Sequence, residues 1–131
     1  MATQVEGRGQ GPGPGHQRRG FEAWSWLFMR LSGLVLVFLA LLHFAITHII
    51  NDVAETDYRF VAERWENPLW RVFDWLLLAL ALLHGANGAR WVAEDSVRRP
   101  RARKVVKGLL YGASAVLFAY GTFTIVAFSP A

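Results

Sequence analysis

Three long apolar segments constrain this chain more than any other feature of its sequence. They cover residues 24–48, 69–93 and 105–128 of 131, and hydrophobic residues make up 53% of the chain. A helix needs about 20 apolar residues to cross the roughly 30 Å hydrocarbon core of a bilayer, and each segment is long enough. Helices also satisfy their backbone hydrogen bonds internally, as hydrocarbon requires. The sequence therefore predicts an all-α membrane protein with three transmembrane helices in an up-down-up bundle.

The first twenty residues have a different composition from the rest. Residues 1–20 are rich in glycine, contain Pro12 and Pro14, and offer almost no apolar surface to bury. This composition predicts a disordered N-terminal tail over residues 1–20, followed by a three-helix transmembrane domain over residues 21–131. No apolar stretch follows the first methionine within the tail, so no signal peptide is expected there.

The placement of charge predicts an orientation in the membrane. The net charge is +4, with basic residues in the tail and in the run 98–107, whereas the connection between the first two apolar segments is mainly acidic. Because cytoplasmic loops carry an excess of Lys and Arg, the sequence predicts a cytoplasmic N-terminus and a C-terminus outside the inner (cytoplasmic) membrane. The basic run also predicts contact with anionic membrane lipid, or docking of a soluble partner, in preference to nucleic acid.

Cysteine is absent, which excludes disulfides and thiolate-ligated iron-sulfur or zinc sites within this chain. Histidine remains as the candidate ligand of a metal or a haem. His84 lies deep in the second apolar segment, eleven residues before Asp95. Eleven residues turn a helix by about 1100°, nearly three full turns, so the two side chains face the same way about 16 Å apart along the axis. Polar groups in hydrocarbon indicate a functional site by default.

Counting depth along the helices places His84 opposite residues 31–33, with Arg30 slightly nearer the cytoplasm. A porphyrin needs an axial imidazole in an apolar slot and cations near its propionates. We therefore predict His84 as a haem ligand, with Arg30 and Ser32 in its vicinity. Small residues at this level leave room for such a group: Gly33, Gly85, Gly88 and Ala89.

Each of these residues also has a purely structural interpretation. His84 could be a core histidine bonded to a neighbouring helix, and the glycines could simply let helices approach closely. Arg30 could extend to the headgroups. At the cytoplasmic edge, Arg90 and Asp95 could form an interfacial pair or a cap.

Two further histidines lie near the outer end of the first apolar segment. His43 falls at the depth of Asp74, which predicts an imidazole–carboxylate pair, and His48 is close to the outer loop. A second haem ligand, or an outer quinone or proton site, is the alternative. We favour the structural interpretation, because the outer loop leaves His48 accessible to solvent.

The third apolar segment contains no Asp, Glu, Lys, Arg or His after Lys107. It carries the small-xxx-small pattern that lets helices pack closely. The sequence therefore predicts a packing role for this helix. The small residues are Gly108, Gly112, Ala115 and Ala119.

With these residues in view, the chain resembles the smaller, hydrophobic cytochrome b membrane anchor of the succinate dehydrogenase (succinate:quinone oxidoreductase) family. Residues 26–33, WLFMRLSG, are similar to the opening of that family's first helix, where an arginine precedes small residues. The second helix ends in the family's pattern of a histidine, small residues, and an aspartate eleven positions on. The helix count and the basic connection before the third helix agree as well.

The resemblance implies a membrane anchor that helps to bind haem b and quinone, and that docks a flavoprotein and an iron-sulfur subunit for electron transfer from succinate to quinone. His84 would supply one axial ligand to the iron, and a second cytochrome b anchor subunit would supply the other. Arg30 and Ser32 would lie near the haem propionates or the quinone. Asp95 would stand at the quinone site, with Arg90 nearby to order water or relay protons.

One position departs from the family's pattern. A tyrosine that bonds a quinone carbonyl often follows this aspartate, whereas the present chain has the shorter Ser96. The pocket would then bind a different quinone, use water, or take donors from partner subunits. Two other functions stay open: a cytochrome b anchor of another membrane dehydrogenase, and a cofactor-free structural membrane subunit.

Overall fold

The computed structural model of the chain describes the backbone of residues 15–128 and the side chains of residues 20–128. Three long helices make up most of it: α1 (Gly15–Phe44), α3 (Pro68–Ser96) and α4 (Pro100–Ala127). The segment between α1 and α3 contains a π-helical turn, a 3-10 turn and one short helix. These are η1 (Ala45–Ile50), η2 (Val53–Glu55) and α2 (Tyr58–Glu66).

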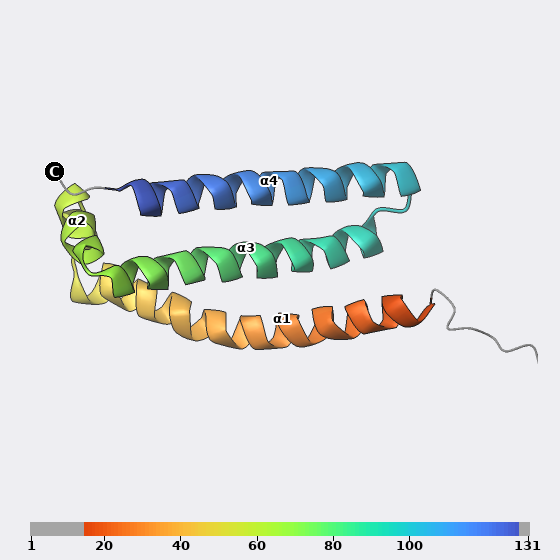
Figure 1. Cartoon of the computed structure of the whole chain (residues 1–131), viewed down its shortest axis with the longest axis horizontal. Coiled ribbons are helices and arrows are strands. Elements are labelled where there is room, and N and C mark those ends of the chain that lie inside the picture. Colours follow the sequence, from red (N-terminus) through yellow and green to blue (C-terminus); the bar gives the residue numbers. More distant parts are fainter. Residues whose placement is uncertain (1–14, 129–131) are drawn as a thin grey trace, which may run out of the picture.

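Helix α3 lies between α1 and α4, runs antiparallel to both and packs against both (Figure 1). Each is long and apolar enough to cross a membrane, over Gly20–Ile50, Pro68–Ser96 and Pro100–Ala127. These findings confirm the predicted all-α fold with three candidate transmembrane helices.

The helices begin earlier than the apolar segments do. α1 begins at Gly15, so it overlaps the end of the predicted tail, and residues 1–14 lie outside the described part of the chain. Pro68 and Pro100 occupy the first turns of α3 and α4. Backbone N–H groups have no acceptor within the helix there, so the N–H that proline lacks is not needed. The side-chain oxygen of Asn67 caps α3 by accepting from the Leu69 N–H at 2.9 Å.

Helix α2, which the apolar pattern does not predict, lies across the end of the molecule where α1 joins α3 (Figure 1). Its Arg64 and Trp65 both donate to the carboxylate of Asp74 in α3, Trp65 through Nε1 at 2.7 Å. Nδ1 of His43 in α1 lies 3.4 Å from Oδ1 of the same Asp74. The predicted proximity of His43 and Asp74 is confirmed, within a cluster that joins α1, α2 and α3, but Nδ1 of His43 makes no hydrogen bond there.

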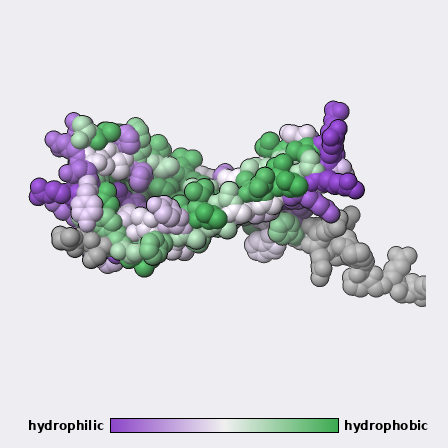
Figure 2. All heavy atoms as spheres, turned by 90° about the horizontal axis from the view of Figure 1, so that it is seen from above, coloured by the Kyte–Doolittle hydropathy of each residue, from purple (hydrophilic) through white to green (hydrophobic). Residues whose placement is uncertain are grey.

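The interior between the long helices is built from small side chains. Among the buried residues are Ala79, Ala86 and Ala93 of α3, and Ser25 and Ser32 of α1, whereas large hydrophobic side chains face outward. Figure 2 shows hydrophobic residues along the length of the helices and hydrophilic ones gathered toward the two ends. In water such a surface would cost about 25 cal/mol for each Å² exposed. Lipid or other membrane subunits therefore have to cover it.

The small residues of α4 do not pack this helix as predicted. All four members of the predicted stripe are exposed, and a Cβ on Gly108 or Gly112 would meet nothing within 4 Å. α4 instead turns another face to α3: a Cβ on Gly121 would lie 2.5 Å from Leu78 Cδ2. Trp75 Nε1 also donates to Thr122 Oγ1 on that face at 3.0 Å. The prediction is therefore wrong for contacts within this chain, because Gly121 makes the close approach.

Candidate functional site

The histidine in the middle of α3 is held by a hydroxyl on α1. Nδ1 of half-buried His84 lies 2.9 Å from Oγ of Ser32, which is only 4% exposed. Ser32 donates its hydroxyl proton to the Phe28 carbonyl one turn earlier, at 2.6 Å. Because a hydroxyl carries one proton, Ser32 can only accept from His84. In the neutral imidazole the proton therefore lies on Nδ1, and Nε2 carries the lone pair.

Glycine residues on both helices shape the surroundings of this imidazole. A Cβ on Gly33 would approach His84 Cε1 to 3.2 Å, so Gly33 makes room for the ring. A Cβ on Gly85, next to the histidine, would meet nothing within 4 Å. Gly88 lies against Met29, whose Cε would be 3.4 Å from an added Cβ. Gly33 thus clears space at the histidine itself, whereas Gly88 serves the contact between α1 and α3.

Arg30 does not join His84 within this chain. Its side chain is exposed, and its guanidinium stacks on the indole of Trp26, 3.9 Å from the ring centroid. Such cation–π contacts hold a guanidinium in place. The structure thus brings Ser32 to the histidine and leaves Arg30 on the exposed surface of α1.

Arg90 is the centre of a polar cluster near the α3–α4 connection. Its side chain is buried, and the cluster joins all three long helices. The i,i+4 spacing of Arg90 and Glu94 was the signal in the sequence that could have revealed the cluster. The guanidinium donates to Asn87 and Ser25 at 3.2 Å, and to Glu22 and Glu94 at 3.4 Å, while Lys107 binds Glu94 at 2.7 Å.

The remaining residues predicted for a quinone site lie at the end of α3. Asp95 and Ser96 are both exposed, and Arg90 pairs with Glu94 instead of Asp95. Glu94, four positions after Arg90, lies on the same side of the helix as Arg90. Asp95, one position further, is turned about 100° away from Glu94. Since α3 is an uninterrupted α-helix over Pro68–Ser96, Asp95 does share a face with His84.

The outer histidine His48 has a hydrogen-bond arrangement like that of His84. Thr47 Oγ1 donates to the His43 carbonyl at 2.8 Å and lies 2.7 Å from His48 Nδ1. Here, however, the hydroxyl comes from the adjacent residue. The exposed ring stacks on Phe44, with 4.6 Å between centroids. His48 thus lies at the accessible end of η1 and not between two helices.

These features define a class of protein: a three-helix integral membrane subunit whose apolar surface is left for lipid and other chains. His84 is hydrogen-bonded to the neighbouring spanning helix near the middle of α3, whereas His43 lies beside Asp74 nearer the α2 end of the bundle.

Comparison with known proteins identifies the family. Residues 13–124 match the succinate dehydrogenase/fumarate reductase transmembrane subunit family. The chain is also 30% identical over 102 residues to the succinate dehydrogenase hydrophobic membrane anchor subunit of Archaeoglobus fulgidus, covering 78% of this chain and 86% of that protein. The chain therefore belongs to this family, as a membrane anchor subunit of a succinate:quinone oxidoreductase or fumarate reductase complex.

Proposed function

We propose that His84 is one axial ligand of a haem b shared with a second cytochrome b anchor subunit. In this proposal the chain also helps to bind quinone, and it docks the iron-sulfur and flavoprotein subunits that deliver electrons from succinate. The observation that carries the proposal is the hydrogen bond between Ser32 and His84, which puts the proton on Nδ1 and leaves Nε2 free. Metal-binding histidines almost always donate their other ring N–H to a fixed acceptor, which orients the ring and raises its basicity.

The surroundings of His84 fit a porphyrin. Gly33 removes the one Cβ that would crowd the imidazole, and the neighbouring Gly85 adjoins open space. When bound, a haem supplies one-electron redox chemistry at a potential set by its ligands and nearby charges. Ser32 would hold the ring in place. Arg30, within about 60° of Gly33 around α1, would present its cation to a propionate on the same side.

The end of α3 supports a quinone site near the iron-sulfur subunit. Asp95 and Ser96 offer an exposed carboxylate and hydroxyl that can order water or bond a quinone oxygen. Arg90 would act indirectly, because it holds α1 against α3 beneath them. The basic connection at this end supports a cytoplasmic location for it, with the N-terminus on the same side and the C-terminus outside.

Absorption spectra of the purified complex test this proposal. We expect a reduced haem b band in the wild type, its loss in His84→Ala, and its retention in the matched control His48→Ala. Reduction of that band by succinate would separate a succinate dehydrogenase from the anchor of another dehydrogenase. An unchanged spectrum in His84→Ala would overturn the assignment of the ligand.

A further inference from the structure

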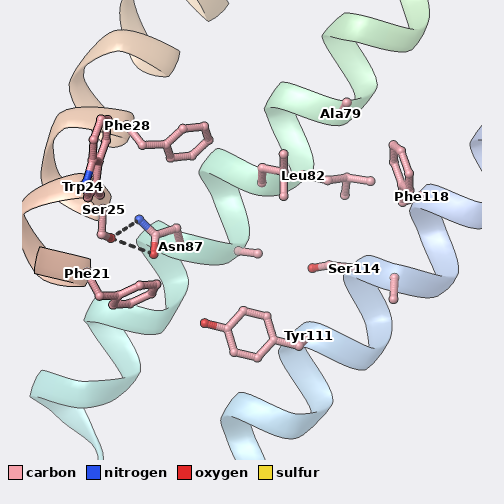
Figure 3. Close-up of a pocket in the computed structure, with 13 residues that line it drawn as sticks. Phe21, Trp24, Ser25, Phe28, Ala79, Leu82, Asn87, Tyr111, Ser114 and Phe118 are labelled. Atoms are coloured by element: carbon pink, nitrogen blue, oxygen red, sulfur yellow. Dashed lines mark hydrogen bonds between the residues drawn. The ribbon is translucent and has the colours of Figure 1, made fainter. Parts of the chain in front are cut away.

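An apolar groove runs between α1 and α4, and α3 forms its floor (Figure 3). Its volume is about 660 Å³. Aromatic side chains form its walls, Trp24 and Phe28 on α1 and Tyr111 and Phe118 on α4, while Ala86 lies in the floor. The lining of the groove is thus almost entirely hydrocarbon.

The groove lies on the other face of α3 from the proposed haem ligand. Leu82 and Ala86, both in its lining, are two residues before and two residues after His84. At about 100° per residue, each points about 160° away from His84 around the helix. A ligand of the groove would therefore not contact the imidazole.

Two polar side chains in the wall of the groove already bond one another. Asn87 donates to Ser25 at 2.9 Å (Figure 3). Arg90, outside the lining, donates to both of these residues. The hydroxyl of Tyr111 points toward the space between the helices (Figure 3). A polar headgroup would find few groups to bond at this depth. A hydrocarbon chain, by contrast, matches the apolar lining and leaves the hydrogen bonds between Asn87 and Ser25 intact.

A basic side chain stands beyond one end of the groove. Lys104, Tyr111 and Phe118 are seven residues apart on α4, so they share one face of the helix. The distance from Lys104 to Phe118 along the axis is about 21 Å, close to half of the roughly 40–45 Å thickness of a whole bilayer. The groove itself covers about 10 Å of this distance, from Tyr111 to Phe118, and Lys104 lies beyond it at the level of the headgroups.

The charges near this end of the groove favour the binding of an anionic ligand. Residues 97–131 contain six Lys and Arg residues and no acidic residue. Lys107 is neutralised by Glu94 at 2.7 Å, and Glu22 and Glu94 both contact Arg90. Lys104 is exposed, and no carboxylate forms an ion pair with it in the part of the chain that is described.

We propose that the groove binds one anionic phospholipid from the leaflet at the α3–α4 end of the molecule. One acyl chain lies between Phe28 and Phe118, over Ala86, and the phosphate lies near Lys104. Tyr111, about 10 Å deeper than Lys104, presents its hydroxyl toward the glycerol esters. The complementary charge selects an anionic lipid over a zwitterionic one, by roughly fivefold for each cation at the surface.

Native mass spectrometry of the intact complex tests this proposal. The complex is reconstituted in vesicles of phosphatidylcholine with a minority of phosphatidylglycerol, and is then released in mild detergent. We expect one retained phosphatidylglycerol per copy of the chain. Ala115→Phe fills the groove and should lose this lipid, whereas the matched control Ala119→Phe, one turn further along α4 and outside the lining, should keep it.

A second variant keeps the test decisive if Ala115→Phe does not assemble. Lys104→Gln should leave the groove filled but lower the ratio of phosphatidylglycerol to phosphatidylcholine about fivefold. Equal retention of the two lipids by the wild type, or unchanged retention by Ala115→Phe, would overturn the proposal, as would a partner helix seated in the groove. The haem absorbance depends on the opposite face of α3, so it reports assembly separately from lipid binding.

Discussion

The hydrogen bond between Ser32 and His84 leads to a quantitative prediction for haem binding. Ser32→Ala removes the acceptor and leaves the Nδ1–H of His84 unpaired between α1 and α3. A buried donor without a partner costs about 1–3 kcal/mol. Since about 1.4 kcal/mol is tenfold in affinity, haem should bind roughly 5- to 150-fold more weakly. This range overlaps the roughly 10- to 100-fold loss that is typical for outer partners of metal ligands.

Titration of haem into the haem-depleted complex, followed by its absorbance, measures this loss. A redox titration adds a second readout, because an imidazole without its Nδ1–H acceptor donates less to the iron and should raise the midpoint potential. Thr47→Ala is the matched control, since Thr47 makes the same two kinds of hydrogen bond, to a carbonyl one turn earlier and to His48. Its haem affinity and potential should equal those of the wild type.

Two results would refute the reasoning. If Ser32→Ala assembles and keeps both the affinity and the potential of the wild type, Ser32 does not orient the ligand. If Thr47→Ala shows the larger loss, the ligand is His48, at the opposite end of the bundle from the proposed quinone site.

The remaining predictions concern packing and the end of α3. Gly121→Val should lower the stability of the chain in detergent by about 1–3 kcal/mol, because its side chain would displace Leu78, whereas Gly112→Val should leave thermal unfolding unchanged. Equal losses would show that α4 does not use the Gly121 face. Asp95→Asn should slow quinone reduction by about 10²-fold or more without altering stability, since its side chain is exposed. The adjacent Glu94→Gln should do the reverse, with a modest loss of stability of about 0.2–1 kcal/mol and normal quinone kinetics.

The depth of polar residues could be predicted from the sequence with good accuracy. The count of about 1.5 Å per residue placed His43 level with Asp74, and His84 level with Ser32. The structure confirms both, at 3.4 Å and 2.9 Å. Depth is predictable because a membrane span has a fixed rise and a known direction once its ends are identified.

The partners of these residues were harder to predict. Arg90 was expected beside Asp95 near the membrane edge, yet it lies in the interior and binds Glu94, Asn87 and Ser25. Helix α2 was also missed, because it is short and does not have the continuous apolar character of the spans. Its Asp57 cap was the local signal for its start.

The sequence by itself determined how many helices cross the membrane, how deep each polar side chain lies, and which residues share a face of one helix. All of these follow from the rise and turn of a single α-helix. Only the tertiary structure decided which face each helix turns to its neighbours: Gly121 toward Leu78 while Gly112 faces outward, and Ser32 toward His84 while Arg30 faces outward. The rotation of a helix about its own axis depends on packing between side chains that are distant in sequence. In a span that is apolar on nearly every side, periodicity carries little information about that rotation.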